Sequence, residues 1–95
     1  MKKYEVMYIL KANLDDAART AEINKLHDIF TKNGGAVTKV DTWGLRDLAY
    51  PINDETKGFY VVIKVDADNV CLKEFERLTK FDRNMLRHLV TVDKD

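Results

Sequence analysis

Lysine and arginine side chains are the residues of this sequence that could bind an anionic ligand, and one arginine stands in an unusual segment. The stretch WGLRDLAYPI, residues 43–52, holds Arg46 among aromatic and apolar residues. If the turn after it centres near residue 55, antiparallel pairing places Arg46 opposite Lys64. Lys64 would then lie beside Lys2 and Lys3 at the start of the first strand. The sequence therefore predicts a cluster of cations at one end of a sheet, where each phosphate neutralised would add about 0.7 to 0.9 to the salt dependence of binding.

These cations have an alternative interpretation as ordinary solvated side chains. Three acidic residues close to them in the sequence or in the expected pairing support it: Glu5, Asp47 and Asp66. From the residues alone, both interpretations stay open.

Residue types that carry catalysis or bind metals are sparse. The sequence has no serine, which excludes a serine nucleophile. His27 and His88 are expected on a helix and a strand, without a second ligand at metal-binding spacing. Cys71 is expected in the first turn of a helix, where a packing or a surface thiol is a better explanation than a reactive thiolate. Gly34 and Gly35 follow a helix instead of opening one, so they do not form a phosphate-binding loop. We expect no enzyme, no metal, no cofactor and no small-molecule substrate.

Length and charge limit the remaining functions. The chain has 95 residues, which suits one domain over residues 1–95. Its 16 basic and 16 acidic residues give a formal net charge of zero, so nucleic-acid binding would need a local patch or a partner's charge. No apolar run approaches the ~20 residues of a membrane span. The one cysteine permits no internal disulfide, which is consistent with the cytoplasm.

Hydrophobic periodicity predicts the elements that position these side chains. Alternation and β-branched residues predict strands over residues 3–10, 36–52, 59–65 and 85–92. Helical spacing predicts a first helix capped by Asn13 or Asp15 and a second capped by Asp68 or Asn69. Their inward residues are expected to be Ala18, Ala21, Ile23, Leu26, Ile29 and Phe30 in the first helix, and Leu72, Phe75, Leu78 and Thr79 in the second.

The order β-α-β-β-α-β predicts an α+β fold. Two helices would cover one face of a four-stranded antiparallel sheet, in the ferredoxin-like arrangement with strand order 4-1-3-2. Gly44 predicts a bulge, and Pro51 predicts that residues 36–52 lie at an edge of the sheet. Residues 53–58 have the composition of a turn. Trp43 is expected mainly to pack at the base of the hairpin and secondarily to offer a stacking surface.

The sheet face away from the helices should be apolar enough to bind a partner or to be covered by one. Besides Arg87, that face is expected to carry Met7, Ile9, Leu48, Tyr60, Val62 and Leu89. Scattered surface hydrophobic residues are the alternative interpretation.

Three segments, WGLR-LAYPI, KGFYV and LRHLV, carry a resemblance to a known family. With MKKYEVMYIL at the start, the chain resembles bacterial small-subunit ribosomal protein six from residue 2 to residue 92. The resemblance implies a ferredoxin-like fold, no catalysis and a place on the platform of the small subunit. It also implies binding to small-subunit ribosomal RNA as a heterodimer with small-subunit ribosomal protein eighteen, in the cytoplasm.

This resemblance assigns RNA contacts to the cations and partner contacts to the apolar face. The RNA-binding set is Lys2, Lys3, Arg46, Lys64 and Arg87, and the partner-binding set is Met7, Ile9, Leu48, Tyr60, Val62 and Leu89. The family often has a second basic residue after Arg46, and Asp47 stands there instead, so a basic doublet is not expected.

Other functions of proteins with this fold fit the sequence less well. A small acyl-phosphate hydrolase needs an arginine in a glycine-rich cradle after the first strand, and ILKANLDD has neither. A ligand-sensing regulatory domain is a further alternative that the fold alone leaves open. The segment KGFYVVIK lacks the second aromatic residue of an RNA-recognition motif, because Val61 stands in its place.

Overall fold

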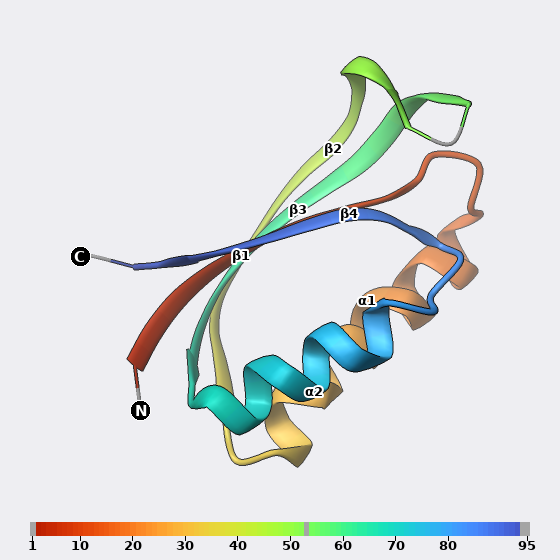
Figure 1. Cartoon of the computed structure of the whole chain (residues 1–95). Helices are drawn as coiled ribbons and strands as arrows, with labels where there is room; N and C mark the ends of the chain where they lie inside the picture. Colours follow the sequence, from red (N-terminus) through yellow and green to blue (C-terminus); the bar gives the residue numbers. More distant parts are fainter. Residues whose placement is uncertain (1, 53, 94–95) are drawn as a thin grey trace.

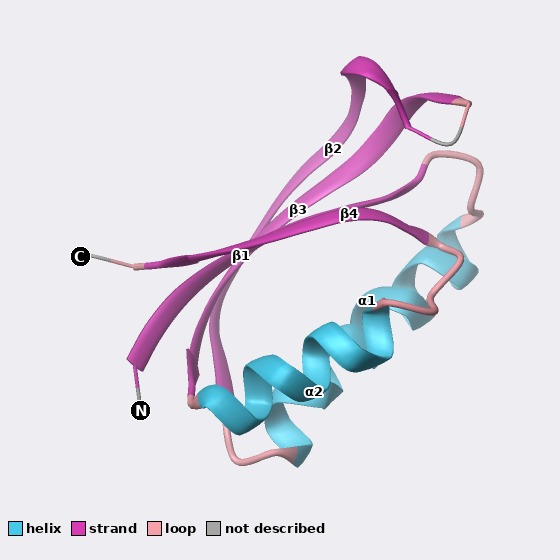
Figure 2. Ribbon diagram, viewed as in Figure 1, coloured by secondary structure: helices cyan, strands magenta, loops and turns pink. Residues whose placement is uncertain are grey.

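The alternating strands and the two amphipathic helices assemble into the predicted order. The computed structural model describes residues 2–52 and 54–93. Its elements are β1 (Lys2–Lys11), α1 (Asp16–Lys32), β2 (Ala36–Ile52), β3 (Glu55–Ala67), α2 (Asn69–Thr79) and β4 (Met85–Val92). The antiparallel sheet has the order β2-β3-β1-β4, and both helices cover the same face of it (Figures 1 and 2). The predicted fold class and strand order are therefore confirmed.

Local signals place the ends of the helices. The carboxylate of Asp15 accepts a hydrogen bond from the Ala18 amide at 2.7 Å, and that of Asp68 accepts one from the Cys71 amide at 3.0 Å. Each satisfies an amide that has no partner within its helix. At the other end of α1, Gly34 adopts a φ of 85°, which a glycine tolerates without strain.

The core lies between the helices and one face of the sheet. Val6, Tyr8 and Leu10 of β1 alternate into it, and the Phe30 and Phe75 rings join the two helices with centroids 4.9 Å apart. Within residues 2–52 and 54–93, the other fully buried side chains are Leu26, Val61, Ile63, Val65, Ala67 and Cys71. Because β1 and β3 place only every second residue here, their remaining residues form a second, open face.

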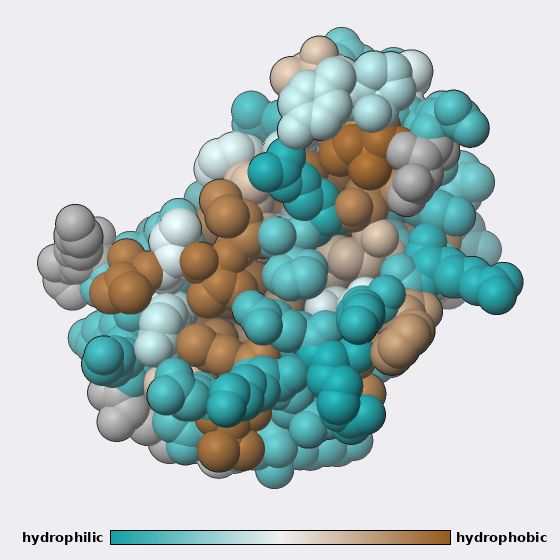
Figure 3. Space-filling model, viewed as in Figure 1, coloured by the Kyte–Doolittle hydropathy of each residue, from teal (hydrophilic) through white to brown (hydrophobic). Residues whose placement is uncertain are grey.

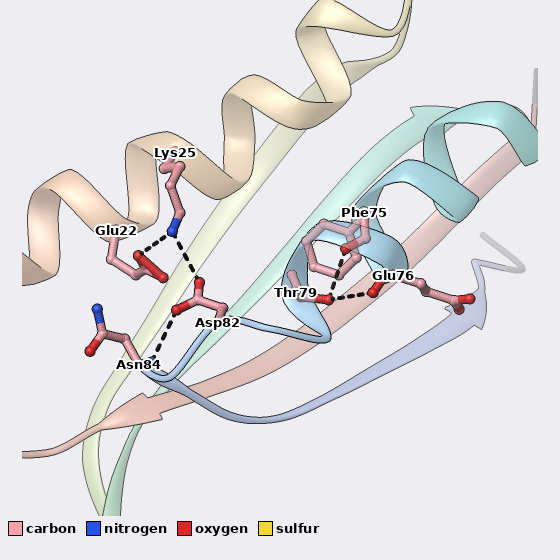
Figure 4. A network of polar contacts seen from close by, with 7 residues as sticks. All are labelled: Glu22, Lys25, Phe75, Glu76, Thr79, Asp82 and Asn84. Atoms are coloured by element: carbon pink, nitrogen blue, oxygen red, sulfur yellow. Dashed lines mark hydrogen bonds and ion pairs between the residues drawn. The ribbon is translucent and has the colours of Figure 1, made fainter.

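The first helix differs from its predicted inward stripe. Ala18 and Ala21 are exposed, whereas Glu22 is buried. Glu22 is tolerated there because its carboxylate lies 3.1 Å from the Lys25 ammonium, which in turn lies 3.3 Å from Asp82 (Figure 4). Burial raises the pKa of Glu22 above its ordinary value.

The second helix and the hairpin turn also differ in detail from the expectation. Leu78 is exposed and Cys71 is buried, because the inward stripe of α2 runs through Cys71, Phe75 and Thr79 at intervals of one helical turn. β3 begins at Glu55, so the turn predicted over residues 53–58 is mostly strand. The part of that prediction on Asn53 lies outside the described residues.

Candidate nucleic-acid interface

The pairing of β2 with β3 decides where Arg46 lies. Arg46 is opposite Gly58, whereas Lys64 is opposite Lys39. Six residues of strand separate Gly58 from Lys64, which is about 20 Å at about 3.3 Å per residue. The predicted pairing of Arg46 with Lys64, and the single cation cluster built on it, are therefore wrong.

The physical reason is the combination of a tighter turn and several bulges. β3 starts at Glu55, and the register shifts between Val37 and Lys39, between Thr42 and Gly44, and between Asp47 and Ile52. Each shift changes the sum of paired residue numbers, so a register extrapolated from one assumed turn does not hold along the strand. The bulge predicted at Gly44 and the edge position predicted for Pro51 are confirmed.

The end of the sheet that carries Lys2, Lys3 and Lys64 is electrostatically balanced. Lys3 pairs in register with Asp66, and Lys64 pairs with Glu5 across β1. The Lys64 ammonium also lies 3.5 Å from the Asp93 carboxylate. Because acidic side chains lie beside these lysines, they are better explained as ordinary charged surface residues than as a phosphate-binding site.

The opposite end, next to the β2–β3 hairpin, has an excess of positive charge on the open face. Arg87 lies beside Ile9, which lies beside Tyr60, and Arg46 lies two residue pairs further toward the hairpin. Alternation along β1 puts Lys11 on the same face as Ile9. Of the acidic residues in the hairpin strands, Asp47 and Glu55 alternate to the other face, whereas Asp41 lies opposite Val62 on the open face. We call the open-face positions Lys11, Arg46 and Arg87 the basic end.

Trp43 forms a stack at the basic end. Its indole lies parallel to the Tyr60 ring, with centroids 6.3 Å apart and 8° between the planes. The Arg46 guanidinium carbon lies 5.0 Å from the centre of the indole, and the indole N–H donates to Asp41 at 3.2 Å. Trp43 nevertheless remains 42% exposed. Trp43 therefore packs against Tyr60 and Arg46 and also keeps an exposed surface.

The Gly44 bulge explains this stack. Residues three apart in a regular strand point to opposite faces, and one extra residue brings them to the same face. Gly44 has a φ of 85° at the register shift, and Trp43 and Arg46 meet across it. The bulge was visible in the sequence, so the meeting of Trp43 and Arg46 could have been predicted from it.

Tyr50 connects the two edges of the sheet at the basic end. Its hydroxyl oxygen accepts a hydrogen bond from Arg87 Nη1 at 2.7 Å, although β2 and β4 lie on opposite edges. The β2–β3 hairpin curves over at its tip (Figure 1). Gly58 of β3 allows Ile9 of β1 to pack closely against it, since a Cβ atom at position 58 would overlap Ile9 Cγ2. No sequence pattern indicates the bond between Tyr50 and Arg87.

The residues predicted to bind a protein partner share the open face but differ in accessibility. Ile9 and Val62 are only 4% and 9% exposed, whereas Leu89 is 46% exposed. Met7, Leu48 and Tyr60 are intermediate. Figure 3 shows apolar surface over β4 and near the hairpin tip, separated by hydrophilic side chains. The accessible part of this face is therefore a strip around Leu89 and Met7, beside the basic end.

The rest of the described surface has fewer groups that could bind a ligand. A hollow of about 380 Å³ lies between α1 and α2, lined by Leu26, Ile29 and Leu78 with charged residues around them. Within residues 2–52 and 54–93, no three His, Cys, Asp or Glu side chains are grouped so that they could hold a metal ion. No helix in this part of the chain is long and apolar enough to span a membrane.

Fold and surface together define a small ferredoxin-like protein with an open sheet face that carries an apolar strip and a basic end. A solved structure has the same fold. The crystal structure of the 30S ribosomal protein S6 from Thermotoga maritima matches with a TM-score of 0.91 and 26% identity, over 97% of this chain and 87% of that one.

Residues 3–91 match the family model of ribosomal protein S6. The chain belongs to the ribosomal protein S6 family and is a small-subunit ribosomal protein. The family resemblance predicted from WGLR-LAYPI, KGFYV and LRHLV is confirmed, and the family is a structural component of the ribosome.

Proposed function

We propose that this protein is a cytoplasmic, non-catalytic component of the small ribosomal subunit that binds ribosomal RNA in the platform region together with small-subunit ribosomal protein eighteen. The observation that carries the proposal is the open face, where an apolar strip adjoins a basic end with the three cations Lys11, Arg46 and Arg87. The Asp41 carboxylate lies near this end and bonds to the Trp43 indole, so positive charge still exceeds negative charge there. An apolar strip suits a protein partner, and an excess of cations suits phosphate.

The balance of charge explains why a partner is needed. With 16 basic and 16 acidic residues, the whole chain has little long-range attraction for RNA. The basic end supplies only a few cations, so its attraction is short-ranged. A basic protein bound to the strip around Leu89 and Met7 would add phosphate contacts beside those of Arg46 and Arg87.

The predicted RNA-binding residues divide into two groups under this proposal. Arg46 and Arg87 contact RNA from the basic end. Lys2 and Lys3 contribute from the far end, and Lys64 contributes weakly because Asp93 already neutralises it. Among the partner-binding residues, Leu89, Met7, Leu48 and Tyr60 make contact. Ile9 and Val62 support that surface from beneath, as their burial requires.

The test is a filter-binding titration with platform RNA at about 0.15 M salt, a physiological ionic strength. It compares this chain alone, protein eighteen alone, and both together. We expect weak binding by the chain alone and tight, specific binding by the pair. Tight binding by the chain alone would refute the partner requirement. Binding by the pair no tighter than by protein eighteen alone would refute a contribution of this chain to recognition.

A further inference from the structure

The stack of Tyr60, Trp43 and Arg46 has a geometry that phosphate binding does not require. A phosphate contact needs only a mobile cation, whereas here the Arg46 guanidinium is 5.0 Å from the centre of an indole that is 42% exposed. The bond from the indole N–H to Asp41 holds the ring plane in place. The result is a preorganised planar surface that remains open to solvent.

We propose that this stack binds one unpaired base of an RNA strand by stacking. The inference rests on the proposed RNA-binding function and adds to it a recognition mode and a site. Unpaired bases stack on aromatic rings and on arginine planes, and every base offers such a face. The sugar-phosphate backbone on either side of the stacked base would lie near Arg87 and Lys11.

The surroundings favour RNA over a protein partner at this position. Arg46, Arg87 and Lys11 share the face with the stack, and the hairpin acids Asp47 and Glu55 alternate away from it. Asp41 is the acid at the stack, where its carboxylate accepts the indole N–H bond, and the three cations outnumber it. A protein segment would gain most from the apolar strip around Leu89. The exposed indole lies on β2, at the edge of the sheet opposite β4. There the cations of the basic end would make the best contacts with a negatively charged sugar-phosphate backbone.

The test measures the affinity of the pair with protein eighteen for platform RNA in variants of the full chain. Trp43→Leu removes the aromatic plane and keeps apolar bulk, and Trp43→Phe keeps a ring. We expect Trp43→Leu to weaken binding by about 5- to 100-fold, the range for loss of one stacked base, and Trp43→Phe to weaken it much less. The salt dependence of the Trp43→Leu variant should stay unchanged, since no phosphate contact is lost.

Arg46→Lys separates stacking from charge. It keeps the cation and removes the planar group, so affinity should fall with an unchanged salt dependence. Phe81→Leu is the matched control, because Phe81 is an aromatic side chain that is 79% exposed in the loop between α2 and β4, away from the open face. This variant should bind as the wild type does. Thermal midpoints of all variants confirm that they fold.

Trp43 is the single tryptophan of the chain, so its fluorescence reports on the site directly. Quenching should appear when RNA is added to the pair, measured as the difference from the Trp43→Leu pair. If protein eighteen alone produces the full change, or Trp43→Leu weakens the pair without RNA, the stack binds protein and the inference is overturned. Wild-type affinity in the Trp43→Leu pair would overturn it as well. Failure of the wild-type pair to bind RNA would overturn the proposed function along with it.

Discussion

The asymmetry of charge along the open face yields a quantitative prediction. Replacing Arg46 and Arg87 with glutamine removes two cations from the basic end without adding an acid. Each phosphate contact contributes about 0.7 to 0.9 to the slope of log affinity against log salt. Loss of both contacts should therefore lower the slope by about 1.4 to 1.8. Between 50 and 200 mM salt, the double variant should lose about ten-fold less affinity than the wild type does.

The matched control is Lys64→Gln at the other end of the sheet. Asp93 lies 3.5 Å from the Lys64 ammonium, so removing this lysine changes the local charge toward RNA less than removing an unopposed arginine. We expect its slope to change by less than half as much as for a single arginine variant. The assay is filter binding of the pair with protein eighteen to platform RNA at several salt concentrations between 50 and 200 mM.

Stability must be measured beside affinity. Arg46 is exposed, so Arg46→Ala should change the free energy of unfolding by no more than about 0.5 kcal/mol while it weakens incorporation into the small subunit. A collapsed thermal midpoint would show that Arg46 is structural. A slope change for Lys64→Gln as large as for the arginine variants would refute the division of the face into a balanced end and a basic end.

Three further predictions concern the fold. Gly35→Ala should destabilise the protein by about 1–3 kcal/mol, because its Cβ would lie 2.7 Å from the Asp66 carbonyl oxygen. A lower urea midpoint with an unchanged m-value checks this, and an unchanged midpoint contradicts it. Phe75→Ala should cost about 3–5 kcal/mol and Phe81→Ala less than about 0.5, in the same urea assay, because only the first ring is buried; equal losses would be inconsistent with the core described. Burial raises the pKa of Glu22, so the folded protein favours the protonated form of this carboxyl group. The contribution of Glu22 to the free energy of unfolding is therefore fully present below its pKa in the unfolded chain. This contribution is lost as the pH rises through its pKa in the folded protein. Glu22→Gln should therefore raise the thermal midpoint at pH 7 by a few degrees, but not near pH 4, and a lower midpoint at pH 7 would show that the lysine ion pair outweighs burial.

The fold was predictable because its signals are local. Alternation in β1 and β3 and the caps Asp15 and Asp68 act over a few residues, so sequence spacing was enough to find each element. Burial of Glu22 instead of Ala21 was not predictable from helical spacing, since it depends on Lys25 and on Asp82 from a distant loop.

The candidate site was predictable only in part, because it depends on register. Residue types identified Arg46 and Arg87 as cations and Gly44 as a bulge. Which cations lie together depends on the length of the turn and on three register shifts, whose effects accumulate along β2. The predicted register was wrong by six residues of β3, and it therefore placed Arg46 at the Lys64 end of the sheet instead of at the hairpin end.

The central position of β1 has a consequence for the timing of folding during synthesis. β1 is made first, but it pairs with β4, which is made last: Tyr4 lies opposite Val92. Pairings between residues so far apart in the chain form slowly and only after the whole segment has left the synthesising ribosome. Arg87 reaches Tyr50 only after that step. We therefore expect a growing chain to lack the assembled binding face, so that only completed molecules compete for a place in a new subunit.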